Sequence, residues 1–488
     1  MNVALTLARQ AQSTPDAIAY AGATGAAVSY AAFERTVNAL AGRLAARGIA
    51  PGQVAAIATT DLYRYLAVAL ALGRLGVVHA PISLPSHLTD LVLADGELPG
   101  SDGARVVPLH ELWPGGVDQG GGTAPTAVHA GGAAAFMLCP TSGSTGAPKF
   151  VPVSHDLAAR RLAGRAREVA DAIGGRGPGA LRQACYIGIG SSYAFTSALV
   201  VLSAGGTVLE PNLNVDTMAD WLRNSGVNRI IASPIALQKL AAVLPEPRVP
   251  NAIESVEAGG GALSAGVRSL VARRMCANIV VTYGLTECGR VAGAPAAALP
   301  DRAGAVGYPY PGVAVGIVDE EGRPVPAGTE GAIRVRSDRC ASAYLDDARA
   351  TAAVFRDGWV YPRDRGVLER DGLLRVVGRA DGVINRGGAK IDPRAIEAAL
   401  MALGGIADVA VFGAADDAHM TSVCAAIVTS APIDAAVFHA RARAALGARA
   451  PAFVMQLSAL PRDANGTVDR AALARMAVEA SRRRTSPG

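Results

Sequence analysis

Helical segments and short apolar runs alternate over the first 80 residues of this chain. Apolar side chains recur at helical spacing over residues 33–47 and 62–75, and strand-like apolar runs follow these segments at 54–57 and 76–80. This order is the β-α-β rhythm of a parallel sheet covered by helices. The sequence therefore predicts an α/β fold whose large N-terminal domain is built on helix-covered, mainly parallel sheets.

The pattern changes after about residue 312. Turn-separated strand runs at 313–318, 331–335 and 372–377 indicate a small β-rich subdomain. At about 150 residues per domain, 488 residues are too many for one ordinary domain. We predict an N-terminal domain at 1–379 and a small, mobile α+β C-terminal lid domain at 380–488.

Composition and charge exclude several classes of protein. Half of the residues are apolar and 18% are charged, so the chain can bury a large core. The net charge of +5 is spread without long basic blocks, and we expect no nucleic-acid partner. Residues 65–84 are the most apolar stretch, but they carry Arg74 and His79. A buried helix and strand are therefore expected there, and no membrane span.

The cysteines and the N-terminus indicate the compartment. The six cysteines are scattered without a Cys-x-x-Cys pair, which is typical of reduced thiols. The first residues lack a basic segment followed by a long apolar run, so no signal peptide is predicted. We expect a cytoplasmic protein. Residues 100–132 are rich in Gly and Pro, and most of them are expected to form a surface connection.

The strongest chemical motif is residues 141–149, TSGSTGAPK, directly after the apolar run at 133–139. Glycines let backbone N–H groups turn toward an anion, and hydroxyls and a lysine add donors for phosphate oxygens. Only three of the 46 basic residues are lysines, and Lys149 is one of them. The motif is not a Walker loop, because Pro148 precedes the lysine and no Ser or Thr follows it. The alternative is a Ser/Gly surface turn.

Further motifs follow in order along the chain. Residues 283–287, YGLTE, come after another apolar run and place a hydroxyl and a carboxylate where phosphate and Mg²⁺ can bind. Simple helix capping is the alternative for this motif. Residues 358–364 (GWVYPRD), 378–381 (GRAD) and 385–390 (NRGGAK), taken singly, indicate turns and a hinge.

Rival enzyme classes lack their own signatures. A serine hydrolase needs a Gly-x-Ser-x-Gly elbow, which this sequence does not contain. A metalloenzyme needs clustered His or Cys, and the seven histidines are isolated along the chain. The glycines at 175–179 lack the strand context of a dinucleotide site. His155 is expected to pack at, or cap, a helix start.

Taken in this order, the motifs resemble those of the acyl-adenylate-forming superfamily: acyl- and aryl-CoA synthetases, peptide-synthetase adenylation domains and luciferases. The resemblance covers nearly the whole chain. Residues 383–391, VINRGGAKI, are most similar to CoA ligases of aryl and other small acids. The resemblance implies an ATP- and Mg²⁺-dependent ligase that passes through AMP.

The resemblance also implies roles for individual residues. The implied nucleotide-binding residues are Thr141, Ser142, Gly143, Ser144, Thr145, Gly146, Lys149, Gly259, Gly260, Gly261, Tyr283, Gly284, Asp364 and Arg379. In such enzymes the loop at 141–149 covers the β- and γ-phosphates, and the tyrosine stacks on adenine. The aspartate accepts the ribose hydroxyls.

The resemblance to the superfamily implies catalytic and pocket residues in the same way. Thr286 would hold the α-phosphate and Glu287 the Mg²⁺, and Asp381 would be the hinge of the small domain. The acyl pocket would include Tyr193, Pro234 and the glycine wall at 259–261. For these pocket residues, simple core packing is the alternative.

One departure from the superfamily concerns the chemistry directly. Residues 460–470 match its Pro…Asn-Gly-Lys-x-x-Arg motif except at Thr467, where the catalytic lysine is expected. A short hydroxyl cannot replace a long ammonium. Three explanations stay open: another cation such as Arg462, Arg470 or Lys390 substitutes, the protein only transfers the acyl group of a preformed adenylate, or it binds without turnover.

The predicted function is ATP-dependent activation of a small or aromatic carboxylic acid, followed by transfer to a thiol. That thiol is CoA or the phosphopantetheine of a carrier protein, and an amine acceptor is an alternative. A monomer and a homodimer are equally compatible with the sequence. The acid itself is not specified.

Overall fold

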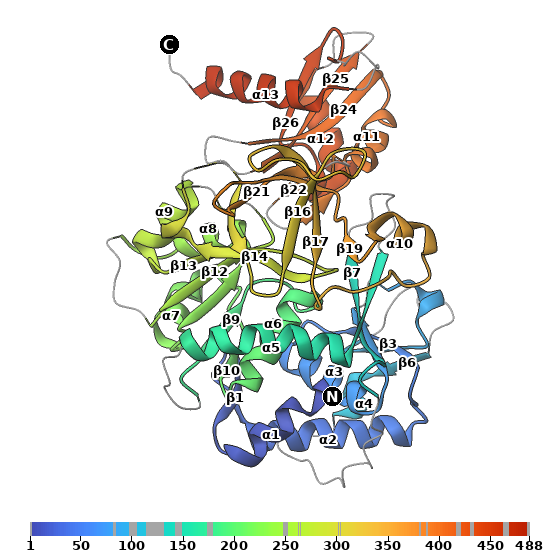
Figure 1. Cartoon of the computed structure of the whole chain (residues 1–488), viewed down its shortest axis with the longest axis vertical. Coiled ribbons are helices and arrows are strands. Elements are labelled where there is room, and N and C mark those ends of the chain that lie inside the picture. The colour runs from blue at the N-terminus through green and yellow to red at the C-terminus, as the bar shows by residue number, and fades with distance from the viewer. Residues whose placement is uncertain are drawn as a thin grey trace.

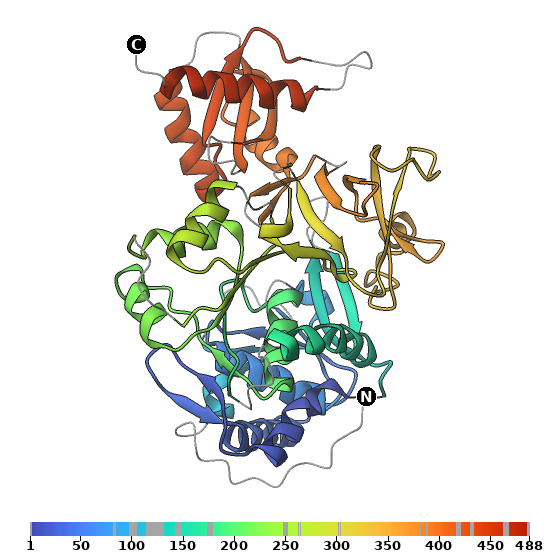
Figure 2. The same ribbon diagram turned by 60° about the vertical axis from the view of Figure 1, so that its left-hand side comes forward.

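The computed structural model describes residues 2–81, 84–96, 105–113, 131–141, 149–172, 179–246, 252–261, 263, 265–300, 302, 304–379, 382–386, 389–415, 421–429, 434–461 and 468–485. A large body carries two sheets, and a smaller unit containing α11–α13 stands on it (Figure 1). The view in Figure 2 shows the same separation, with the C-terminal helix lying across the far end of the small unit. The predicted α/β class is confirmed.

The segments that show the β-α-β pattern form part of the first sheet. Its strand order is β6-β5-β3-β4-β7-β8, and every pairing is parallel except the hairpin of β7 with β8. Its strands are β3 (Val54–Ala58), β4 (Val78–Pro81), β5 (Leu91–Ala94), β6 (Arg105–Pro108), β7 (Ala135–Thr141) and β8 (Lys149–Ser154). Of the expected surface connection at 100–132, residues 100–104 and 114–130 lie outside the described part of the chain. Residues 105–112 form β6 and the helical turn α4, because Val107 and Leu109 are buried there.

The second sheet holds the middle of the chain and the β-rich subdomain. From β1 to β13 the strands pair in parallel in the order β1-β10-β9-β11-β12-β13, and beyond β13 the pairings are antiparallel. Its parallel part comprises β1 (Ile18–Ala21), β9 (Arg182–Cys185), β10 (Thr207–Leu209), β11 (Arg229–Ala232), β12 (Ser255–Gly259) and β13 (Ile279–Leu285), with β2 (Ala27–Ser29) on the edge. The antiparallel part comprises β14 (Gly289–Pro295), β15 (Ala305–Pro309), β16 (Ala314–Val318), β17 (Glu330–Arg336), β18 (Phe355–Arg356), β19 (Trp359–Val360), β20 (Asp364–Leu368) and β21 (Leu374–Arg379).

Helices cover both sheets and form the layer between them. The helices of the large body are α1 (Thr6–Ser13), α2 (Tyr30–Ala46), α3 (Leu62–Arg74), α4 (Leu109–Leu112), α5 (His155–Ala172), α6 (Ser192–Ser203), α7 (Val215–Asn224), α8 (Pro234–Ala242), α9 (Ala265–Arg274) and α10 (Ala348–Val354). Short polar caps start several of these helices. Before α3, for example, Asp61 accepts from the Arg64 N–H at 2.9 Å. Because α3 and α6 are apolar on nearly all sides, both are buried. They meet where the rings of Tyr65 and Phe195 lie 6.1 Å apart.

The C-terminal unit has cores of its own. The strands β24 (Ile406–Ala415), β25 (Thr421–Thr429) and β26 (Phe453–Leu457) form one sheet, and β22 (Ile384–Arg386) and β23 (Ala389–Ile391) form a two-stranded ribbon. Side chains alternate across the sheet. Val411 packs with α11 (Pro393–Met401) and α12 (Ala435–Leu446), and Phe412 packs with α13 (Arg470–Thr485) on the other face. These cores agree with a separate C-terminal domain, and its boundary at residues 379 and 380 stays a prediction. None of the described helices has the length and apolar character needed to cross a membrane.

Two histidines are buried where α3, α6 and the first sheet meet. Neither ring nitrogen of His79 has a hydrogen-bond partner among the described residues, and its ring lies 5.0 Å from that of Phe136. His155 begins α5, as expected for helix-start packing, and its Nδ1 accepts the Val3 N–H at 3.3 Å. Burial lowers the pKa of His79 to about 3 and that of His155 to about 4. Both rings are therefore neutral in the folded protein at neutral pH.

We expect the free energy of unfolding to fall as the pH is lowered below about 6.5. Between the unfolded pKa near 6.5 and the lower folded values, the unfolded chain binds more protons, so acid favours it. Each histidine contributes a slope of about 1.4 kcal/mol per pH unit in that window. Urea unfolding at pH 7, 6 and 5 measures the slope. His79→Leu is expected to reduce it, whereas His110→Gln, at an exposed position, leaves it unchanged. An unchanged slope in His79→Leu would contradict this account.

Candidate active site

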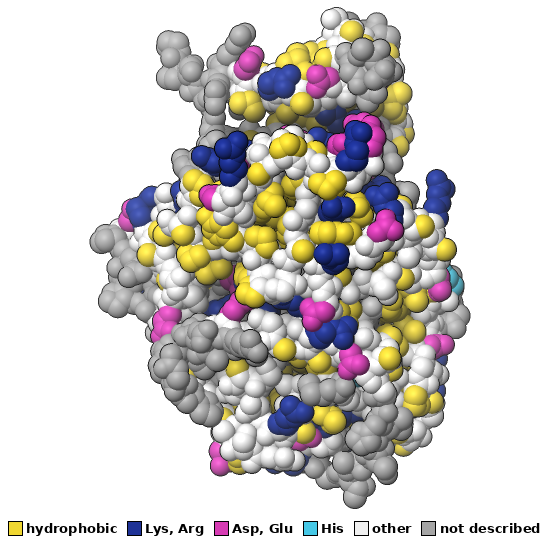
Figure 3. Space-filling view, in the orientation of Figure 1, with side chains coloured by type: hydrophobic (Ala, Val, Ile, Leu, Met, Phe, Trp, Pro, Cys, Tyr) yellow, Lys and Arg dark blue, Asp and Glu magenta, His cyan; other side chains and the backbone are white. Residues whose placement is uncertain are grey.

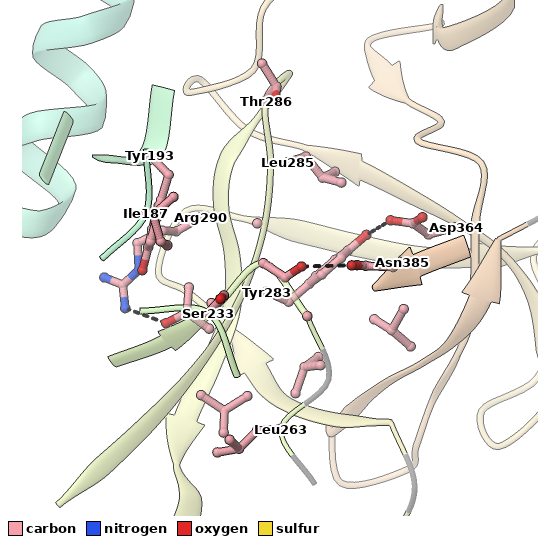
Figure 4. A pocket seen from close by; sticks show the side chains of 18 of the residues that line it. Ile187, Tyr193, Ser233, Leu263, Tyr283, Leu285, Thr286, Arg290, Asp364 and Asn385 are labelled. Atoms are coloured by element: carbon pink, nitrogen blue, oxygen red, sulfur yellow. Dashed lines mark hydrogen bonds between the residues drawn. The ribbon is translucent and has the colours of Figure 1, made fainter. Parts of the chain in front are cut away.

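A cavity of about 1510 Å³ lies where the large body meets the C-terminal unit. Its walls come from α5, α6, β12, β13 and β14 on one side and from β21, β22 and β24 on the other. Apolar side chains gather across the middle of the face shown in Figure 3, below the small unit. Figure 4 shows the polar side chains inside the cavity, with Tyr283 between Tyr193 on one side and Asp364 on the other.

At one end of the cavity, three of the predicted residues are hydrogen bonded together. Tyr283 donates its hydroxyl to Asp364 Oδ2 at 2.6 Å, and Arg379 donates Nη1 to Oδ1 of the same carboxylate at 3.1 Å. Asp364 and Arg379 face each other across β20 and β21, so strand register sets this pair. Burial, followed by the charge of Asp364, raises the pKa of Tyr283 well above its usual value. The phenol therefore stays a donor and fixes the carboxylate.

Thr286 and Glu287 follow β13, and Arg161 on α5 holds their backbone carbonyls in place. The Arg161 guanidinium donates Nη2 to the carbonyls of Thr286 at 3.1 Å and Glu287 at 2.9 Å, and Nε to the Arg339 carbonyl at 3.1 Å. Arg161 is only 5% exposed, and burial lowers its pKa from the ordinary value. Backbone oxygens therefore stabilise a buried cation, and the cation fixes the turn that carries Glu287.

Tyr344 connects Glu287 with Lys149. The Tyr344 hydroxyl donates to Glu287 Oε1 at 2.6 Å, and the Lys149 ammonium lies 5.4 Å from the centre of the Tyr344 ring. Lys149 begins β8 directly opposite Thr141, the last residue of β7. The hairpin thus brings both ends of the 141–149 motif to the carboxylate of the second motif.

The predicted glycine wall at 259–261 lines the cavity. A Cβ atom on Gly259 would lie 3.4 Å from the Tyr193 ring, so only a small residue leaves this ring undisturbed. Gly260 has φ +81°, in the left-handed region that glycine tolerates best. Its carbonyl accepts a hydrogen bond from Asn385 Nδ2 of the C-terminal unit at 3.1 Å. The C-terminal unit therefore contacts the wall itself.

A buried ionic cluster lies behind Tyr193. Glu257 on β12 is 2% exposed, and its carboxylate pairs with Arg165 at 3.1 Å, with Arg290 at 3.5 Å and with Arg229. Tyr193 donates its hydroxyl to the same carboxylate. Burial alone would raise the pKa of Glu257, but the three guanidinium charges outweigh it and hold this pKa well below its ordinary range. The glutamate is therefore ionised.

Sequence comparison places this architecture in a family. A family model described as AMP-binding enzyme matches residues 7–94 and 97–345. The chain belongs to the AMP-binding enzyme family. A second model, AMP-binding enzyme C-terminal domain, matches residues 395–467. The resemblance of the ordered motifs to the adenylate-forming superfamily is confirmed.

Relatives of this AMP-binding enzyme include complete enzymes and parts of larger ones. Feruloyl-CoA synthase of Amycolatopsis sp is 28% identical, over 84% of this chain and 84% of that protein. CymA of Salinispora arenicola, described as a probable noncanonical nonribosomal peptide synthetase, is 30% identical over 91% of this chain. The match spans 6% of the length of that synthetase.

Solved structures share the fold of this AMP-binding enzyme. A double mutant of o-succinylbenzoate CoA synthetase from Bacillus subtilis has a TM-score of 0.79 at 22% identity, over 96% of this chain and 98% of that one. The amide bond synthetase McbA from Marinactinospora thermotolerans has a TM-score of 0.75 at 24% identity, over 96% of this chain and 99% of that one. Both likenesses concern the two-part adenylate-forming fold.

Several of the predicted site residues lie outside the described part of this AMP-binding enzyme. They are Ser142, Gly143, Ser144, Thr145, Gly146, Asp381, Arg462 and Thr467. Lys390 lies on β23 opposite Asn385, the residue that reaches the glycine wall. Arg470 donates to Glu397 at 2.7 Å and to the Val411 carbonyl at 3.1 Å, and it is thus held within the C-terminal unit. Pro234 is buried as the first residue of α8, and its neighbour Ser233 lines the cavity.

The sequence analysis missed Arg161, Arg165, Glu257, Arg290 and Tyr344. A charged residue inside the apolar run that precedes the 259–261 glycines was the available signal for Glu257. The arginines gave no such signal, because nearly all basic residues of this chain are arginines and a single one does not stand out. The predicted roles of the site residues stay proposals.

Proposed function

We propose that this protein activates a small or aromatic carboxylic acid with ATP as an acyl-adenylate and then transfers the acyl group to a thiol of CoA or a carrier protein. The supporting observation is that one cavity joins the Tyr283–Asp364–Arg379 group to Thr286, close to Glu287 and Lys149. An aryl-CoA synthase and a peptide synthetase among the relatives agree with this reaction class.

The nucleotide is proposed to bind at the Asp364 end of the cavity. Tyr283 would stack on adenine against the glycine wall, and the Asp364 carboxylate, held by Arg379, would accept the ribose hydroxyls. Lys149 and Thr141 would close the loop over the β- and γ-phosphates. Fixing the nucleotide in this way places its α-phosphate near Thr286 and presents it to a second bound reactant.

Glu287 is the residue proposed to hold Mg²⁺. It is a hard oxygen ligand, nearly buried, with Oε1 fixed by Tyr344, and these properties fit an ion that takes its other ligands from phosphate oxygens and water. When bound, Mg²⁺ supplies positive charge for the phosphates. Thr286, anchored through Arg161, would donate its hydroxyl to the α-phosphate.

Two bonds form and two break over the reaction. A carboxylate oxygen of the acid attacks the α-phosphorus, and the bond to the bridging oxygen breaks so that pyrophosphate leaves. A thiolate then attacks the acyl carbon, and AMP leaves with the electron pair of the C–O bond. The chain's part is to bring two anions together and to disperse their charge, because their repulsion opposes the first step.

Thr467 is the observation that favours a second candidate function. A protein without the superfamily lysine could still bind a preformed acyl-adenylate and perform only the transfer, since the thiol step uses little of that lysine's charge in the superfamily. Binding without turnover is the remaining alternative. Both keep the nucleotide end of the cavity intact.

Carboxylate-dependent exchange of pyrophosphate into ATP tests the proposal. Over a panel of aryl and short-chain acids, we expect exchange that requires both Mg²⁺ and one class of acid. Thioester formation with CoA is measured in parallel. Transfer from a synthetic acyl-adenylate without exchange would favour the transfer-only candidate. Binding of AMP without exchange or transfer would favour the binding-only one.

A further inference from the structure

The buried cluster around Glu257 carries more positive than negative charge. Arg165, Arg229 and Arg290 surround Glu257, and the only other carboxylate among their described ion pairs is Glu168, which bonds Arg290. The side chains of the three arginines are 6%, 12% and 8% exposed, whereas Glu168 is 40% exposed and also lines the cavity. Three largely buried cations therefore face one buried carboxylate and one partly exposed carboxylate.

Such an excess is costly unless something compensates it. A buried ion that lacks a counter-charge loses far more hydration energy than it regains from neutral neighbours. The other described partners of these arginines are neutral: Arg165 bonds the Ser197 hydroxyl at 3.4 Å, and Arg290 bonds Thr282 at 3.3 Å and the hydroxyl of Tyr310. An anion in the cavity would supply the missing charge.

The cluster opens onto the cavity. Arg165 and Arg290 are both among its lining residues, and each lies over an aromatic ring that also lines it, Tyr193 at 5.3 Å and Tyr310 at 4.1 Å. Arg290 is paired with Gly284 across β13 and β14, one residue from Tyr283. Figure 4 places Arg290 and Tyr193 on the opposite side of Tyr283 from Asp364, so the charges lie away from the nucleotide end.

Apolar side chains also line the cavity. Ile187, Leu263 and Leu285 line the same cavity. A ligand that fits these lining residues has an anion at the Thr286 end, a hydrocarbon or aromatic body, and a second anion at the arginines. Guanidinium groups suit such an anion because they bind carboxylates with planar, paired donors.

We propose that the acid activated here carries a second anionic group, most simply a second carboxylate, which Arg165 and Arg290 bind. The inference rests on the proposed function, whose substrate class it specifies. A monocarboxylic acid of the same shape leaves the arginines without a counter-charge, and a site built for a polar group rejects a ligand that lacks it.

Paired probes separate charge from shape. Calorimetry in the presence of AMP compares adipate with monomethyl adipate and isophthalate with monomethyl isophthalate. We expect a dissociation constant at least about tenfold lower for the diacid in one of the pairs, which corresponds to about 1.4 kcal/mol. Arg165→Met and Arg290→Met are each expected to abolish that preference, and Arg290→Lys to restore part of it. Arg182→Met is the control, since Arg182 donates to the Ser225 carbonyl and lies outside the cavity lining.

The outcomes are decisive even if a methionine variant fails to fold, because the paired acids are first compared on the unaltered protein. Equal or weaker binding of the diacid in both pairs overturns the proposal, as does a preference that survives both methionine variants. The cluster is then a structural ion network. Pyrophosphate exchange with monoacids alone leaves the proposed function standing and removes this inference. Arginine-dependent diacid binding without exchange supports a diacid site at these arginines and removes the proposed activation.

Discussion

Replacing Thr467 by lysine is expected to raise the rate of carboxylate-dependent ATP–pyrophosphate exchange by about 10²–10³, the usual worth of one preorganised donor to developing negative charge. A lysine at 467 restores the residue that the superfamily resemblance implies for bridging carboxylate and phosphate. The rate of acyl transfer from a synthetic acyl-adenylate to CoA is expected to change little. Exchange and transfer measured on the same preparation separate the two half-reactions.

The control for this prediction is Thr467→Met, which lengthens the side chain without adding charge and is expected to leave exchange at the parent level. If Thr467→Lys gives no acceleration while the parent exchanges readily, another cation already performs the task. Lys390 is then the leading candidate, because β23 places it opposite Asn385 beside the glycine wall, whereas Arg470 is held by Glu397. Lys390→Met would then lower the parent rate.

Glu287→Gln is expected to lower exchange by about 10²–10³ and to raise the Mg²⁺ concentration needed for half-maximal rate. The substitution keeps the shape of the side chain and removes the charge that binds the ion. Titration of the exchange rate with MgCl₂ measures both effects.

Tyr344→Phe is the matched variant for the Glu287 prediction. It removes the 2.6 Å hydrogen bond to Glu287 and keeps the negative charge and the ring beside Lys149. A net hydrogen-bond contribution of about 1 kcal/mol predicts a loss of about fivefold. Equal losses in the two variants would contradict a charge role for Glu287, because the phenylalanine variant retains that charge.

The proposed nucleotide end of the cavity could be predicted from sequence because its residues lie in short motifs that resemble those of the superfamily. The roles of Tyr283, Asp364 and Arg379 are implied by the resemblance to the superfamily. The register of β20 and β21 pairs Asp364 with Arg379, and the Tyr283 hydroxyl bonds the same carboxylate. The α/β class could be predicted from the alternation of helical segments and short apolar runs over the first 80 residues.

The end of the cavity lined by Arg165 and Arg290 could not be predicted in this way. Arg165, Glu257 and Arg290 come from α5, β12 and β14, and each is an isolated charge in its own segment. Only the register of β12, β13 and β14 and the position of α5 bring these charges together. Tyr344 was missed for the same reason, because its partner Glu287 is 57 residues away in sequence.

Arg161 has a consequence for how activity is gained during folding. Its guanidinium bonds carbonyls 125, 126 and 178 residues further along the chain, so its partners have not been synthesised when α5 first emerges. Contacts of such long sequence separation form late, because closing the intervening loops costs chain entropy before the bonds compensate for it. Until residues 286 and 287 have docked on Arg161, the turn that bears Thr286 and Glu287 lacks its anchor. Activity should therefore return with the slowest phase of refolding. Fragments that end before residue 287 should be inactive even where their sheets form.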